Sequence, residues 1–239
     1  MKNKIKSNNI NMNSVDNKSH ILIMPYGMFC NYDMFLKAGY SKLDNKPERI
    51  LFIVPTYNYC FSSLMGMAAY EFAEIEDYSN FDRDFYMDLR VRYNIHREPF
   101  IFEREEILYP HITYLREHMP ERKLLPLFYN NIKEGVIKSL IEDLREECCF
   151  VFLSFMSLGY SYDEAKDLDE LNAKKIEQNK ADDITHMEFS AFKILPDLME
   201  YNRVNDYKFR RIALQNSADY TDKSKDKTIG YGAWYLTEQ

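Results

Sequence analysis

Glycine is scarce in this sequence, with seven residues in 239, whereas an average composition would supply about seventeen. The glycine-dependent phosphate-binding patterns G-x-G-x-x-G and G-x-x-x-x-G-K-[ST] do not occur, so nucleotide-binding folds of those two kinds are excluded. The nucleophile pattern G-x-S-x-G is also missing, and an α/β-hydrolase serine therefore has no support.

Long apolar segments are lacking as well. No run approaches the roughly 18 apolar residues of a membrane-spanning helix, and residues 1–19 contain no apolar stretch like that of a secretory signal. The chain carries 31 Lys and Arg against 38 Asp and Glu, a formal charge of −7. This acidic balance gives no electrostatic footprint for nucleic acid or a lipid surface, so we expect neither as a partner.

The four cysteines, Cys30, Cys60, Cys148 and Cys149, show no C-x-x-C spacing. The adjacent pair lies in an apolar segment typical of a buried strand, where neighbouring side chains point to opposite faces. We therefore expect buried free thiols rather than a disulfide, a redox pair or a metal site. Free thiols and the lack of a secretory signal together predict a cytoplasmic protein.

Short apolar runs, several of them ending at proline, predict buried strands. These strands are expected at residues 20–24, 50–54, 123–129, 148–155, 207–214 and 228–236. Helices are expected between them, at about residues 132–144, 162–178 and 189–201. The first shows an apolar stripe with a 3.6-residue period, and Ser161 and Glu164 form a capping box that opens the second.

Strands that read as continuous apolar runs and alternate with helices indicate a sheet buried on both faces. We predict one α/β domain over residues 20–239, with a mostly buried central sheet and helices on both of its faces. Residues 1–19 are rich in asparagine and have almost nothing to bury, so we expect a disordered tail there.

Local spacing shows no catalytic or metal-binding constellation. His111 and His118 share a helix face but lie roughly 10 Å apart along the axis, too far for one metal ion, and we expect both to face solvent or cap the helix. Glu103, Glu105 and Glu106 form an acidic cluster where a helix begins, a position at which negative charge suits the helix dipole.

Six segments nevertheless follow one another in the order of a known family. They are MPYGMF at 24–29, VPTY at 54–57, EEILY at 105–109, LSFMSL at 153–158, NSADY at 216–220 and TIGYGA at 228–233. In this order they resemble the Memo family, protein B of the AmmeMemoRadiSam system, whose fold is similar to that of class III extradiol dioxygenases. The resemblance extends from about residue 20 to the end of the chain and implies a dioxygenase-like α/β fold.

The resemblance also implies a pocket that has lost its chemistry. The matching positions form a vestigial pocket of Tyr26, Tyr57, Glu106, Leu158, Ser217, Asp219 and Tyr220. The first four stand where the family has histidines, and Asp219 or Tyr220 stands where some members have a cysteine. Iron or copper needs imidazole, thiolate or carboxylate donors, and tyrosine stays a neutral phenol at pH 7. The resemblance therefore implies no metal, no cofactor and no catalytic residue. The sequence contains 19 tyrosines, and the resemblance relates part of this high number to a replaced active site.

We predict a Memo-like, non-catalytic binding or scaffolding module. The alternative is an enzyme with altered chemistry, in which converging tyrosines bind non-haem iron or copper as phenolates or act as general acids. A third interpretation is an interaction protein unrelated to the family, in which residues 26, 57 and 220 lie far apart. Family association names an AMMECR-type protein or a radical-SAM protein as the protein partner to test.

Overall fold

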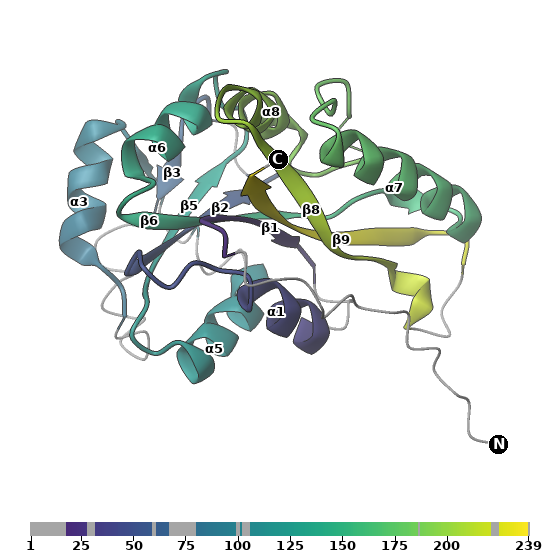
Figure 1. Ribbon diagram of the computed structural model, residues 1–239, viewed down its shortest axis with the longest axis horizontal. Helices are drawn as coiled ribbons and strands as arrows, with labels where there is room; N and C mark the ends of the chain where they lie inside the picture. Colours follow the sequence, from purple (N-terminus) through teal and green to yellow (C-terminus); the bar gives the residue numbers. More distant parts are fainter. Residues whose placement is uncertain are drawn as a thin grey trace.

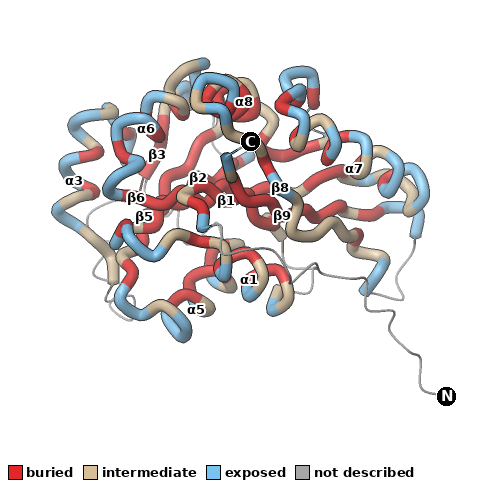
Figure 2. The backbone as a smooth tube through the Cα atoms, in the orientation of Figure 1, coloured by how far each residue is buried: buried red, intermediate tan, exposed pale blue. Residues whose placement is uncertain are grey.

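The computed structural model describes residues 18–27, 32–58, 61–66, 80–98, 101, 106–185, 187–220 and 225–238. A mixed sheet forms its centre, with strand order β4-β3-β5-β2-β6-β1-β9-β7, and β8 pairs with β9. Helices cover both faces of this sheet (Figure 1), and Figure 2 shows that the strands between them are buried. The predicted α/β class is confirmed.

Four parallel strands make up the middle of the sheet: β1 (Ile21–Pro25), β2 (Arg49–Pro55), β5 (Lys123–Tyr129) and β6 (Cys148–Ser154). Nearly every residue in them is buried, because both faces of the sheet are covered, and this explains the continuous apolar runs. Pro25 pairs with Ser154 and Pro55 with Tyr129. The strands therefore end at one common edge of the sheet.

The remaining strands extend the sheet on either side. β9 (Thr228–Glu238) runs antiparallel to β1, β7 (Leu158–Tyr160) and β8 (Tyr207–Asn216). The two-residue strands β3 (Met65–Gly66) and β4 (His96–Arg97) lie beyond β5. The late strands predicted from the sequence are confirmed, and each is longer than the apolar pattern indicated.

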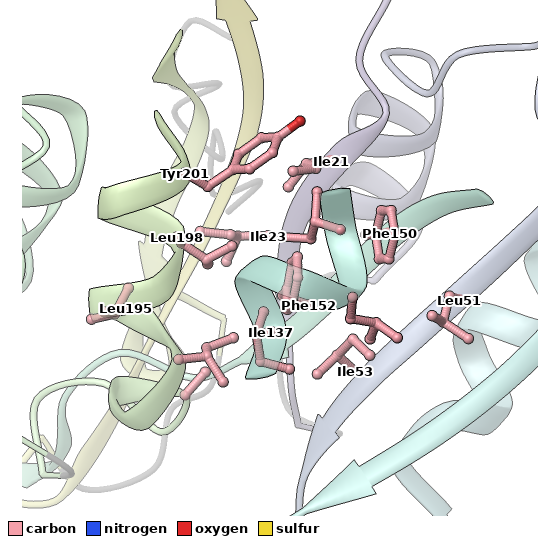
Figure 3. Close-up of a cluster of buried hydrophobic side chains, with 14 of the residues drawn as sticks. Ile21, Ile23, Leu51, Ile53, Ile137, Phe150, Phe152, Leu195, Leu198 and Tyr201 are labelled. Atoms are coloured by element: carbon pink, nitrogen blue, oxygen red, sulfur yellow. The ribbon is translucent and has the colours of Figure 1, made fainter. Parts of the chain in front are cut away.

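Two apolar clusters lie on opposite faces of the sheet, because neighbouring strand residues alternate in direction. One packs α3 (Arg83–Arg92), α6 (Val136–Leu144), α7 (Tyr162–Glu177) and α8 (Leu195–Val204) against strand residues such as Ile23, Leu51 and Phe150. Figure 3 shows the part of this cluster in which Ile137 of α6 and Leu198 of α8 face the strands. The other packs α1 (Tyr32–Tyr40) and α5 (Tyr109–His118) against Leu22 and Phe52.

Helix α6 begins at Val136, four residues later than the apolar stripe predicts. Its start is set by Asp197 of α8, whose carboxylate accepts hydrogen bonds from the backbone N–H groups of Gly135, Ile137 and Lys138 at 2.7, 2.8 and 3.2 Å. The first N–H groups of a helix have no partner within it. A side chain about 60 positions away in the sequence supplies that partner here, which no local pattern could indicate.

Other predicted helices are confirmed with altered detail. Ser161 and Glu164 form the expected capping box of α7, but the inward face of this helix includes buried Asp169 and Asn172, whereas Leu168 is only partly buried. The helix expected at 189–201 begins at Leu195 after a 3₁₀ turn over Phe192–Ile194.

The prediction that His111 faces solvent or caps its helix is wrong. This residue of α5 is completely buried; its Nε2–H donates to the carbonyl of Pro25 at 3.0 Å, and its Nδ1 accepts from the hydroxyl of Tyr40 at 2.8 Å. Burial lowers the pKa of His111 to about 4, so the ring is neutral at pH 7. His118 is exposed, as expected.

The cysteine prediction is confirmed for the described pair, since Cys148 and Cys149 are buried free thiols. Burial raises the pKa of each to about 12, which leaves them unreactive. Cys30 and Cys60 lie outside the described residues, as do Glu103, Glu105 and most of the predicted tail. Ser19, assigned to that tail, is buried and forms a bridge to Leu43. Within the described ranges, no helix is both long enough and apolar enough to cross a bilayer.

Candidate functional site

The carboxyl ends of β1, β2, β5 and β6 meet at one edge of the sheet, where open α/β sheets generally bind their ligands. A cavity of ≈ 240 Å³ opens at this edge, room for about eight water molecules at their share of liquid volume. It is lined by Pro55, Thr56, Tyr57, Tyr129, Asn130, Ser190, Phe192 and Lys193. The first five lie at the ends of β2 and β5 or directly after them, and the last three belong to the segment that leads into α8.

Hydrogen bonds between the ends of β2 and β5 fix one wall of the cavity. The backbone N–H of Thr56 donates to the carbonyl of Tyr129 at 2.8 Å, and the Asn130 amide donates to the carbonyl of Thr56 at 2.8 Å. The two strands therefore stay paired one residue beyond their last regular ladder positions.

Ser190 attaches the other wall to the end of β6. Its Oγ accepts from the backbone N–H of Phe155 at 2.9 Å and lies 3.0 Å from the Oγ of Ser154. Its own backbone N–H donates to the carbonyl of Phe155 at 2.9 Å. The Tyr57 hydroxyl bridges the cavity walls by donating to the carbonyl of Ser190 at 2.9 Å.

Aromatic rings gather around Phe155. The ring centroid of Phe155 lies 5.9 Å from that of Tyr26 and 6.4 Å from that of Tyr57, distances typical of interacting aromatic pairs. Tyr57 is 51 % exposed, which is unusual for a large aromatic residue and places it at the open side of the cavity.

Tyr129 carries a buried polar group that has no partner among the described residues. The side chain is 1 % exposed, and its hydroxyl makes no hydrogen bond with any residue that the structure describes. Burial, and then the neighbouring phenols of Tyr57 and Tyr26, raise the pKa of Tyr129 well above its ordinary value. The residue therefore presents a neutral phenol, which can donate one hydrogen bond and accept others.

Lys193 brings a positive charge to the cavity. Its Nζ donates to the Asn131 side-chain oxygen at 2.7 Å and lies 5.8 Å from the ring centroid of Phe192. Within the described ranges no carboxylate lies within ion-pair distance of this ammonium group, and none lines the cavity. The Asn131 oxygen thus positions the charge without neutralising it.

The structure describes local contacts for five residues of the predicted vestigial pocket. Tyr26 and Tyr57 both contact Phe155, as described above. Leu158 and Ser217 lie at the beginning of β9: Leu158 pairs with Ile229, whose N–H donates to Ser217 Oγ at 3.0 Å. Near them, Asp219 accepts from the Tyr162 hydroxyl at 2.7 Å.

Two further members of that predicted pocket need separate mention. Tyr220 follows the 3₁₀ turn at Ser217–Asp219 and is 36 % exposed. Glu106 begins the 3₁₀ turn at Glu106–Leu108, and its side chain lies outside the described part of the chain.

Sequence reasoning missed Tyr129, Ser190 and Lys193. Tyr129 could have been found, because it ends a predicted strand in the same way as Pro25 and Pro55 end theirs. Ser190 and Lys193 lie more than sixty positions beyond Tyr129, and no local pattern connects them with the sheet edge.

A larger hollow of ≈ 520 Å³ lies beyond the end of α7 and is lined by polar and charged side chains. Three of its charged residues are paired: Arg203 lies 3.4 Å from Asp182, and Asp183 lies 3.0 Å from Lys175 just outside it, whereas Lys180 forms no ion pair within the described ranges. Because both carboxylates of this hollow are already paired and no described aromatic or apolar residue lines it, we regard the smaller cavity at the sheet edge as the functional candidate.

Compared with models of known protein families and with curated protein sequences, the chain matches none. Among the described residues no group of three or more His, Cys, Asp and Glu side chains could hold a metal ion. The function must therefore be inferred from the geometry of the cavity itself.

Proposed function

We propose that this chain is a Memo-like α/β protein that has exchanged the family's metal-binding histidines for other side chains and now acts as a non-catalytic binding module. Its binding site is the cavity at the carboxyl edge of the sheet. The positions of Tyr26 and Tyr57 beside Phe155 support this proposal, because aromatic rings occupy the place where the resemblance implies imidazoles.

The hydroxyl of Tyr129 is the observation that carries the proposal. A buried polar group without a hydrogen bond costs about 1–3 kcal/mol, and natural proteins rarely tolerate this without a reason. Tyr129 lines the cavity, so a ligand whose acceptor atom reaches the buried hydroxyl would remove that cost. A packing role alone would have been served equally well by phenylalanine.

The alternative is an enzyme that binds iron or copper through phenolates. It is favoured by the proximity of Tyr26, Tyr57 and Tyr129, which interact electrostatically. Phenolate ligation requires loss of the phenolic proton, whereas burial shifts the pKa of Tyr129 in the opposite direction. The donor set therefore suits a hydrogen-bonding ligand better than a metal ion.

Two measurements separate the two functions. We expect the purified full-length protein, dialysed against a chelator, to retain no stoichiometric iron, copper or zinc by elemental analysis. A fragment screen by NMR should show ligands that shift the resonances of Thr56 and Asn130. Tyr129→Phe should weaken the binding of these ligands, whereas Tyr109→Phe, at an exposed tyrosine, should leave it unchanged. One tightly retained equivalent of metal that Tyr129→Phe abolishes would establish the alternative.

Location and protein partner are part of the same proposal. A cytoplasmic location is supported by the free thiols of Cys148 and Cys149. An AMMECR-type or a radical-SAM protein remains the partner to test, by co-purification with the tagged full-length chain.

A further inference from the structure

We infer that the ligand of the sheet-edge cavity is a small organic anion, held between the ammonium group of Lys193 and the hydroxyl of Tyr129. This inference rests on the proposed binding function and adds the charge and size of the ligand. It follows from the charge of the lining, from the hydrogen-bonding chemistry of Tyr129 and from the aromatic surfaces beside them.

The charge of the cavity is opposite to that of the chain. The protein as a whole carries a formal charge of −7 with 38 acidic residues, yet the described lining contains one lysine and no carboxylate. A partly enclosed cation repels cations and attracts anions more strongly than it would in open water, because the surrounding protein lowers the effective dielectric constant. The lining therefore selects for negative charge.

Lys193 is held ready for such a ligand. Its ammonium group donates to the Asn131 oxygen at 2.7 Å and has further donors available, since an ammonium group carries three. A neutral amide oxygen orients the group but leaves its charge uncompensated. An anionic oxygen can therefore approach without displacing a competing carboxylate.

Tyr129 supplies the second contact. Its phenol stays protonated because burial raises its pKa, and its hydroxyl is unpaired among the described residues. A protonated phenol donates to a negatively charged oxygen in a charge-assisted hydrogen bond, which is stronger than a bond to a neutral acceptor. An anion thus satisfies both Lys193 and Tyr129, whereas a cation can pair only with the phenol oxygen and is repelled by Lys193.

The rest of the lining limits the body of the ligand. Pro55, Tyr57 and Phe192 contribute flat or apolar surface, and the volume of ≈ 240 Å³ equals about eight water molecules. These surfaces suit a compact, flat organic anion.

Benzoate and benzamide test the inference, because they share size and shape and differ in charge. Binding is followed by NMR chemical shifts of the full-length protein at neutral pH and low salt. We expect benzoate to bind roughly tenfold more tightly than benzamide, the usual scale of one charge-assisted contact, and benzylamine to bind more weakly than either.

Substitutions locate the selectivity. Lys193→Met keeps the aliphatic stem and should lower benzoate affinity to the level of benzamide, whereas Lys193→Arg should preserve the preference. Lys166→Met, at an exposed lysine of α7, is the matched control and should change nothing. Tyr129→Phe should weaken the binding of both compounds, and that of benzoate more, because benzoate loses the charge-assisted bond. Circular dichroism verifies that each variant is folded.

The outcomes separate this inference from the proposed function. Equal affinities for benzoate and benzamide, or unchanged benzoate binding in Lys193→Met, would overturn the anion assignment and leave the binding function standing. If none of the three compounds nor any screened fragment shifts the cavity resonances, both fall together.

Discussion

Replacing Asp169 with asparagine should remove one pH-dependent contribution to the stability of this protein. Asp169 lies on the inner face of α7 and is 2 % exposed. Its carboxylate accepts from the backbone N–H of Ser157 at 2.8 Å, and in the described part of the chain no basic side chain pairs with it. Burial outweighs the hydrogen bond and raises its pKa from 3.8 to about 6.

The sign of the effect follows from proton binding. Because the folded-state pKa is higher than the unfolded one, the folded protein binds the proton more tightly, and the free energy of unfolding rises as the pH falls through 6 toward 4. A difference of about two pKa units corresponds to about 3 kcal/mol. On acidification the free energy of unfolding of the wild type should rise by up to this amount, relative to that of a variant that cannot titrate at this site.

Urea unfolding of wild type and Asp169→Asn between about pH 8 and about pH 4 measures this contribution. The two free energies of unfolding should differ by an amount that changes with pH, wild type gaining as the pH falls. Any constant offset from altered packing cancels. Asp167→Asn, at an exposed position on the same helix, should give a difference that stays nearly flat. A flat difference for Asp169→Asn, or one that runs in the opposite direction, would refute the reasoning.

Three further substitutions test how the site and its supports are held. His111→Phe leaves two buried hydrogen-bonding partners unsatisfied and should lower the free energy of unfolding by about 2–5 kcal/mol. The control His118→Ala should change it by less than about 0.5 kcal/mol. Urea unfolding measures both variants, and equal effects would contradict the buried bridge. Asp197→Ala removes the acceptor at the start of α6 and should lower the free energy of unfolding by about 2 kcal/mol or more. Hydrogen exchange in the first turn of α6 should become faster. Unchanged exchange there would show that the cap is not needed. Gly230→Ala would push a methyl group into the Asp169 carboxylate. It should destabilise the protein more than Gly135→Ala, whose methyl group meets only open space and which should cost about 1 kcal/mol because Gly135 has φ +86°. The reverse order of melting temperatures would contradict this packing.

Several elements were predictable because their causes are local or repeat along the chain. The strands at the centre of the sheet are buried on both faces, so each must be apolar at every position, and that is visible in the letters alone. The capping box of α7 depends on residues three apart. The apolar stripe of α6 depends on the period of the helix. The positions of Tyr26 and Tyr57 followed from the ends of predicted strands.

Other features depend on residues that meet only after folding. The start of α6 is fixed by Asp197, and His111 is buried because it bridges Tyr40 and the end of β1. Asp169 and Asn172 look like ordinary surface residues of a charged helix in the sequence. They are buried because β8 and β9, which come later in the chain, pack beneath that helix.

The candidate site divides in the same way. The sequence by itself determined an α/β fold and placed tyrosines at strand ends where a resembling family has histidines. Only the tertiary structure brought Tyr129, Ser190 and Lys193 to one cavity with Tyr57. The physical reason is that hydrophobic periodicity is written along the chain, whereas a binding site depends on which strand ends and loops are neighbours in space, and strand order is set by packing across the whole sheet.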